Sequence, residues 1–138
     1  MDRGVTRKDR HYARSRVEHR VVTALSPAVQ AATINGVAVD TKGFGSCAVI
    51  LNTGAIVGAG DFGAKLQESD VSGSGYTDVT AGDQVGSFAA TAVADASTKV
   101  SYIGFKRYVR LVLTKAGGTS IAAGAVAILD HASARPVA

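Results

Sequence analysis

The stretch that decides the fold is KVSYIGFKRYVRLVLTK, residues Lys99–Lys115. In its second half, apolar side chains at Val109, Leu111 and Leu113 alternate with mostly polar ones. A period of two residues is typical of a β-strand that has one face on a hydrophobic core. This stretch therefore predicts a half-buried strand whose inner face carries Val109, Leu111 and Leu113.

Further strands are expected on the N-terminal and C-terminal sides of this stretch. CAVILN (Cys47–Asn52) is a continuous apolar run of strand length, and AKLQES (Ala64–Ser69) alternates between its two faces. IAAGAVAILD (Ile121–Asp130) follows a GGTS turn and reads as the last strand. The pattern indicates antiparallel β structure throughout the body of the chain.

Glycine and proline mark the expected turns. Asn35-Gly36 lies between apolar residues, which is a strong hairpin signal. Pro27 excludes a long helix near the start of the apolar material. The glycines at 54, 58 and 60 are expected to break the chain after the strand that begins at Cys47.

The composition favours short strands and tight turns over long helices. The 138 residues include 16 Gly and four Phe but no Trp, and they suit one domain. About seven or eight strands are expected, and only residues 89–96 offer a helical alternative. The predicted fold is all-β, a jelly-roll-like β-sandwich with an extended basic N-terminal arm. The expected divisions are the arm, residues 1–20, the body, residues 21–130, and a C-terminal tail, residues 131–138.

The excess positive charge lies entirely in the arm. Of the 15 Lys and Arg and 11 Asp and Glu residues, seven basic and three acidic ones fall within residues 1–20, so the body holds eight of each sign. A basic arm on a neutral body indicates a tether to an acidic partner, either nucleic acid or a protein surface, or else a solvated tail. The basic residues of the arm are Arg3, Arg7, Lys8, Arg10, Arg14, Arg16 and Arg20.

The sequence contains no apolar run long enough to cross a bilayer and no apolar N-terminal signal segment. The single cysteine, Cys47, excludes an intrachain disulfide, which fits a reducing compartment. Cys47 opens an apolar run and is interpreted as a small buried residue rather than a reactive thiolate.

KLQESDVSGSGYTDV (Lys65–Val79) does not fit a calcium loop and predicts a turn. Counted from Asp70, position twelve of an EF-hand is Ala81, where a bidentate glutamate is required. The flanking segments also read as strands, whereas an EF-hand has helices. The Ser and Gly residues instead suit a turn between Leu66 and Val79.

No catalytic, cofactor-binding or metal-binding residues are assigned from the sequence. GAGDFG (Gly58–Gly63) has the letters of a dinucleotide fingerprint, but the strand-like AKLQES follows where a helix is needed. His11, His19 and His131 lie in the arm and tail and are expected to be solvent-exposed. The pair Glu68 and Asp70 shares a strand face but has no mark of acid–base chemistry.

FKRYVR (Phe105–Arg110) allows two interpretations. Its three cations could contact phosphate while Tyr108 stacks on a base. The favoured interpretation is the outer face of a strand, where Arg110 meets a carboxylate across the sheet.

Five blocks of sequence between Leu25 and Leu129 resemble the capsid cement, or decoration, proteins of tailed phages. They are LSPAVQAATINGVAVDTKGFGSCAVILNTGAI, KLQESDVSGSGYTDV, VGSF, YIGFKRYVRLVL and GAVAIL; the most specific parts are LQESD…YTDV and YIGFKRYVR. The resemblance implies a jelly roll that binds the outside of an HK97-type shell as a dimer or trimer across capsomer boundaries. It implies no catalytic residues and no cofactor.

The expected function is therefore a structural virion protein, not an enzyme, that cements neighbouring capsomers against internal pressure. Its expected partners are the major capsid protein and other copies of itself, with no membrane. The protein is expected to be made in the host cytoplasm and to lie on the outer surface of the phage head. The expected contact residues are the seven arm residues and Ser72, Ser74 and Tyr76 in the exposed loop. A nucleic-acid-binding module and a head–tail connector or tail accessory subunit are the alternatives.

Overall fold

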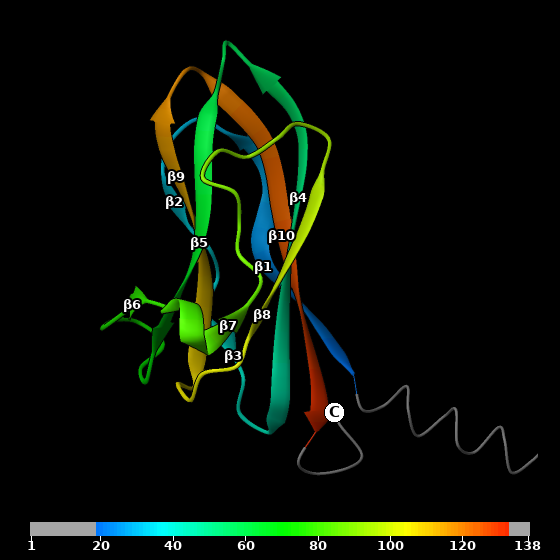
Figure 1. Ribbon diagram of the computed structural model, residues 1–138, viewed down its shortest axis with the longest axis vertical. Coiled ribbons are helices and arrows are strands. Elements are labelled where there is room, and N and C mark those ends of the chain that lie inside the picture. Colours follow the sequence, from blue (N-terminus) through cyan, green and yellow to red (C-terminus); the bar gives the residue numbers. More distant parts are fainter. Residues whose placement is uncertain (1–18, 133–138) are drawn as a thin grey trace, which may run out of the picture.

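The computed structural model describes residues 19–132, which form strands joined by turns and one short 3-10 helix (Figure 1). The strands are β1 (Arg20–Gln30), β2 (Ile34–Asn35), β3 (Val39–Asp40), β4 (Phe44–Val57), β5 (Asp61–Ser69), β6 (Thr77–Asp78), β7 (Gln84–Val85), β8 (Ser97–Tyr102), β9 (Tyr108–Gly117) and β10 (Ser120–Ala132). The helix, η1, spans Ala81–Asp83. The sheet thus includes Arg20, at the edge of the expected arm, and extends to Ala132.

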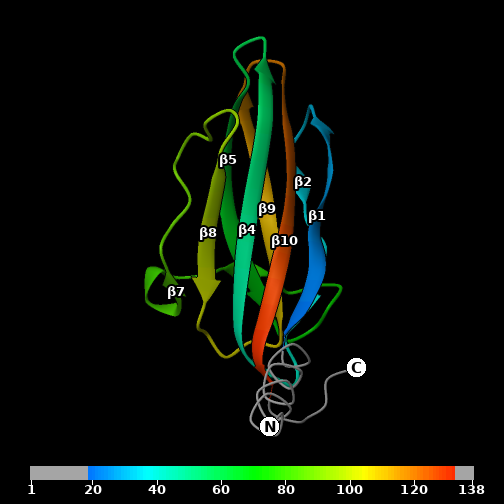
Figure 2. The ribbon, with the colours of Figure 1, turned by 90° about the vertical axis from the view of Figure 1, so that its right-hand side faces the viewer.

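Two antiparallel sheets form the sandwich, as Figures 1 and 2 show from two directions. The first sheet has the order β1-β10-β4-β8-β7, and the second has the order β2-β9-β5-β6 with β3 also on β9. The strands of the first half of the chain pair with those of the second half in reverse order. The pairs are β1 with β10, β2 and β3 with β9, β4 with β8, and β5 with β6. Together these pairs make one long folded hairpin. Two further pairings, β10 with β4 and β9 with β5, wrap this hairpin into the two sheets. This nested order is a jelly roll, so the predicted fold class is confirmed.

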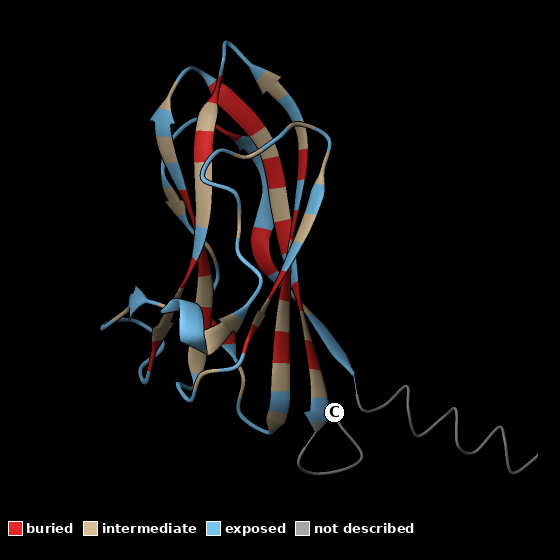
Figure 3. Cartoon of the chain, in the orientation of Figure 1, coloured by how far each residue is buried: buried red, intermediate tan, exposed pale blue. Residues whose placement is uncertain are grey.

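The core lies between the sheets and is built mainly from Val, Leu and Ala. Val109, Leu111 and Leu113 of β9 are fully buried, as the alternation predicted. Phe62 and the other inward residues of β5 also face the core, and Figure 3 shows buried bands alternating with partly exposed ones along the strands. The side chain of Cys47 is buried too, which confirms its interpretation as a small core residue.

The hairpin predicted at Asn35-Gly36 is wrong. Asn35 and Val39 pair with the same strand, β9, so the chain continues along one edge instead of reversing. Gly36 N donates to Leu111 O at 2.6 Å, in the second sheet, and Val37 N donates to Ala24 O at 2.7 Å, in the first. The glycine is needed because it lets the backbone approach both sheets closely, and this contact closes one side of the sandwich.

Two further expectations need correction. Gly54 lies within β4, which continues to Val57, and the reversal occurs only at Gly58, whose φ is +60°. Gly54 is tolerated in the strand because the Ala122 side chain of β10 packs against that position. Residues 89–96 form an irregular segment rather than a helix, since Thr53 N donates to Ala96 O and fixes the segment to β4.

Pro27 lies in β1, which is an edge strand of the first sheet. The pairing of β1 with β10 is irregular between Leu25 and Ala28, on the two sides of Pro27. Proline fits at an edge because it has no N–H to donate to a neighbouring strand. The segment around Pro27 is thus a strand, in agreement with the prediction that no long helix forms there.

We predict that Gly36→Ala destabilises the fold. A Cβ at this position would press on the carbonyl oxygens of Ala24 and Leu111, which belong to opposite sheets. We expect the free energy of unfolding in urea to fall by about 1–3 kcal/mol, the usual range for overpacking. Gly73→Ala is the matched control, because a Cβ there meets nothing within 4 Å. Equal stability of the two variants would contradict the bridging role of Gly36.

Candidate protein interface at one end of the sandwich

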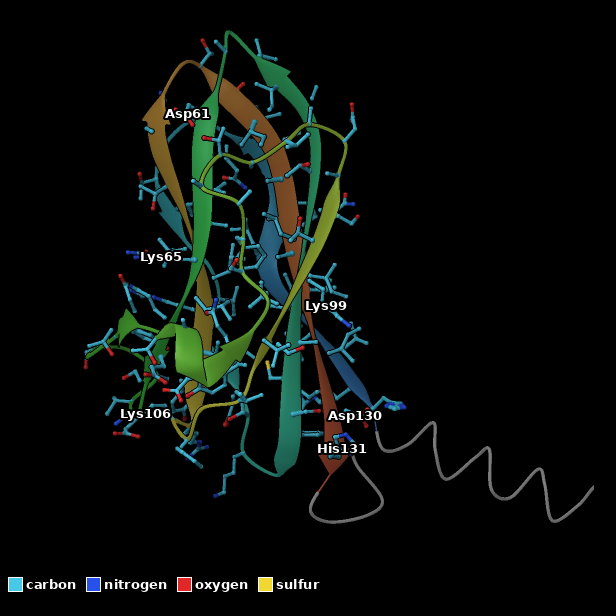
Figure 4. The ribbon with its side chains drawn as sticks, viewed as in Figure 1. Asp61, Lys65, Lys99, Lys106, Asp130 and His131 are labelled. Carbon is cyan, nitrogen blue, oxygen red and sulfur yellow. The ribbon has the colours of Figure 1, made fainter. Side chains whose placement is uncertain are left out.

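Among the residues expected to contact a partner, those that the structure describes lie at one end of the sandwich, here called the loop end. At this end β1 begins, β10 ends, and the turns β3–β4, β5–β6 and β8–β9 are placed, as the pairs Phe44–Ala132, Ser69–Tyr108 and Cys47–Tyr102 show. Figure 4 places Lys106 at one side of this end and Asp130 and His131 at the other.

Arg20, as the first residue of β1, and the loop with Ser72, Ser74 and Tyr76 both lie at the loop end. The remaining arm residues, Arg3, Arg7, Lys8, Arg10, Arg14 and Arg16, lie outside the described residues.

The loop between Ser69 and Tyr76 is held by its own hydrogen bonds. Ser69 Oγ donates to Ser74 O at 2.5 Å and accepts from Val71 N at 3.0 Å. Tyr76 OH donates to Ser72 O at 2.8 Å, and Gly75 has a φ of +74°. These contacts confirm the interpretation as a turn. Ser72 and Ser74 take part in it through their carbonyl groups.

Arg110 and Tyr76 pack on the outer face of the second sheet. The Arg110 guanidinium lies 3.9 Å from the centroid of the Tyr76 ring and donates to Gln67 Oε1 at 3.0 and 2.8 Å. The expectation of a cross-strand carboxylate is therefore wrong, since an amide oxygen occupies that place. Burial raises the pKa of Tyr76. One face of the Tyr76 ring and its hydroxyl are thus already engaged within the chain.

Residues 103–107, here called the Phe105 loop, split the expected long strand into β8 and β9. The Tyr102 hydroxyl donates to Glu68 Oε1 at 2.6 Å and accepts from Lys106 N at 2.9 Å. Burial, and then the bond to Glu68, raise the pKa of Tyr102 well above its usual range. Ile103 N also donates to Asp83 O at 2.8 Å. The loop is therefore fixed to β5 and η1.

Two ion pairs connect the Phe105 loop to its neighbours. Lys106 Nζ lies 2.8 Å from Asp70 Oδ2, and the Asp70 hydrogen bond raises the pKa of Lys106. Arg107 donates to both oxygens of Asp40, at 2.9 and 2.8 Å. The Arg107 hydrogen bond lowers the pKa of Asp40 to about 2. Because both cations already have carboxylate partners, this arrangement does not favour a phosphate site on the segment.

Phe105 is the residue that sequence reasoning missed. Its side chain is 98% exposed, and Ile103 and Val71 nearby at the loop end are 53% and 58% exposed. The sequence pattern predicts one continuous strand over this segment. Gly104 was the available signal for a turn: it packs against the Tyr102 ring, where a Cβ would clash.

The remaining candidate residues do not form a chemical site. Burial raises the pKa of the Cys47 thiol to about 11. His19 and His131 are exposed, as expected, and His19 Nδ1 lies 3.0 Å from Asp130 Oδ1; His11 lies outside the described residues. Within residues 19–132, no three His, Cys, Asp or Glu side chains cluster closely enough to hold a metal ion.

GAGDFG forms a turn and the start of β5, so the strand that the sequence predicts after it is confirmed. No helix in the described part of the chain has the length and apolar character to span a membrane.

A second apolar surface lies on the outer face of the first sheet. A shallow groove of about 300 Å³ is lined by Pro27, Ile50, Gly124 and Val126, and it is here called the outer groove. It lies over β1, β10 and β4, away from the Phe105 loop. The outer groove is the alternative docking surface against which the loop end must be tested.

No protein-family model and no curated protein matches the chain. Among solved structures, a chain from the infectious bursal disease virus Gx strain aligns with a TM-score of 0.45 and 14% identity over 86% of this chain and 33% of that one. The Gt strain gives a TM-score of 0.44 and 13% identity, with the same coverage. The chain thus spans about a third of the length of these viral chains. A likeness of this size assigns no function.

We predict that Asp40→Asn destabilises the protein in a pH-dependent way. The pKa of Asp40 is about 2 in the folded state against an ordinary value of 3.8, so its contribution is complete above about pH 4 and is lost as the pH falls to about 2. Since both partners are partly exposed, we expect a loss of at most about 1 kcal/mol at pH 7. Urea unfolding of the parent and of Asp40→Asn between pH 7 and pH 2 measures this difference in stability.

Arg107→Gln supplies the control for this prediction. In that background the Asp40→Asn substitution is expected to change stability little, because the ion pair is already absent. A difference between parent and Asp40→Asn that stays constant from pH 7 to pH 2 would contradict the role given to this pair.

Proposed function

We propose that the chain is a structural virion protein that binds the outside of an HK97-type phage capsid and cements neighbouring capsomers. One observation carries the proposal. The two most specific blocks of the resemblance, LQESD…YTDV and YIGFKRYVR, meet at the loop end although they are far apart in the sequence. Tyr102–Glu68 and Lys106–Asp70 hydrogen bonds join them directly. The two blocks that carry the resemblance to cement proteins thus lie side by side in the fold.

The fold alone does not decide the function. Jelly rolls occur in viral capsid proteins, lectins and cupins, so the argument has to rest on the surface. The loop end presents two ion pairs, Lys106–Asp70 and Arg107–Asp40, and the exposed apolar side chains Val71, Ile103 and Phe105. Such a surface suits a stable contact with another protein.

The basic arm supplies the second contact in this proposal. Arg20 pairs with Leu129 at the loop end, so the arm joins the body there. Because β1 begins at Arg20, the residues before it would span about 65 Å if fully extended, which is enough to reach a neighbouring subunit. Arginine binds carboxylates in bidentate fashion, and many repeated contacts on a symmetric shell offset the entropy lost on ordering the arm.

We predict that deletion of residues 2–18 weakens shell binding. Shells that lack the protein would be mixed with the full chain or with the deleted one, and bound copies per shell and the temperature of shell disruption would be measured. The deleted chain is expected to show lower occupancy and less heat protection. The deletion leaves β1 intact, since β1 begins at Arg20.

A matched variant separates charge from length. It keeps the arm but replaces its basic residues with glutamine at 3, 7, 8, 10, 14 and 16, and we expect it to behave like the deletion. Full occupancy and full heat protection with both variants would refute the role of the arm. DNA binding that falls steeply with salt, without shell binding, would instead support the nucleic-acid alternative.

A further inference from the structure

We propose that Phe105 is the anchor of the loop end and that it inserts into an apolar pocket on the shell protein. This inference rests on the proposed function and names the residue through which the body binds. The partner it requires is a protein surface with an aromatic-sized apolar pocket.

The first argument is the exposure of Phe105. Its side chain is 98% exposed, so the fold gains almost nothing from its apolar surface. Burial of an apolar side chain is favourable, and here this free energy is available only to a partner. Ile103 and Val71, both more than half exposed, add apolar surface at the same end.

The second argument is that the loop is rigid before binding. Main-chain groups of the Phe105 loop are held at three points: Ile103 N by Asp83 O, Lys106 N by the Tyr102 hydroxyl, and Arg107 O by Thr41 N at 2.9 Å. A loop fixed in this way loses little conformational entropy when a partner binds. The structure therefore holds an exposed aromatic side chain on a rigid support, which is the arrangement found at interface hot spots.

The third argument concerns the chemistry of the partner. Lys106 and Arg107, the two residues that follow Phe105, are paired with Asp70 and Asp40. A phosphate or an anionic lipid headgroup would have to compete with these carboxylates. An uncharged apolar pocket on a protein has no such competition, and the ion pairs would then form the polar rim of the contact.

The test compares Phe105→Ala with the full parent chain on shells that lack the protein. Because the side chain is exposed, the melting temperature is expected to stay unchanged, while the Kd for shells rises about tenfold or more. Val93→Ser, which removes an apolar side chain that is 67% exposed in another loop, is the matched control and should bind like the parent. Val126→Ser removes an apolar side chain from the outer groove, and this variant should also bind shells like the parent.

A second variant tests the rigidity argument without touching Phe105. Tyr102→Phe removes the hydroxyl that holds Lys106 N, and we expect weaker shell binding, measured below the melting temperature of the variant.

The salt dependence of shell binding gives a further readout. Phe105→Ala should lower affinity equally at low and high salt, whereas the glutamine variant of the arm should reduce the salt dependence.

The outcomes separate this inference from the proposed function. If the parent binds shells and Phe105→Ala binds them equally well, the anchor is wrong while the cement function stands. Loss of binding in Val126→Ser alone would assign the contact to the outer groove and overturn the inference. A change only in self-association, seen by analytical ultracentrifugation, would make the partner a second copy and overturn it as well. If the parent binds no shells, the proposed function and this inference both fail.

Discussion

The fully buried row of Val109, Leu111 and Leu113 on β9 sets the register on which the rest of the structure depends. Because side chains alternate across a strand, a slip of one residue would place Arg110 in the core and Leu111 outside it. β9 pairs with β2, β3 and β5, so the same register also fixes the second sheet. It places Tyr108 opposite Ser69 and thereby brings the Phe105 loop beside the turn after β5.

At the loop end, one hydrogen bond connects the two sheets directly. Tyr102 belongs to β8 in the first sheet and Glu68 to β5 in the second, and their side chains meet at 2.6 Å. The same hydroxyl holds Lys106 N, so the joint between the sheets is also the support of the Phe105 loop. Packing in the core therefore determines where the exposed aromatic side chain lies, and the charged contact proposed for the arm would start from the same end.

The sequence predicted those features that local pattern controls. Alternation identified β9 and its inner face, the apolar run at Cys47 predicted a strand, and the Ser/Gly run after Ser69 predicted a turn. The prediction failed where contacts with residues far away in the sequence determine the local structure. Gly36 looks like a hairpin residue, but it contacts Ala24 and Leu111 from separate sheets. The exposed position of Phe105 could not be seen either, because the bonds that fix its loop come from β5, η1 and the β3–β4 turn.

The most direct test of the central claim, that this jelly roll binds a phage shell through its loop end, is an electron-microscopy reconstruction of intact particles. The account predicts many symmetry-related copies on the outer surface, placed across capsomer boundaries, with the Phe105 loop facing the shell. A handful of copies at one vertex, or copies whose loop end faces solvent while the first sheet contacts the shell, would contradict it.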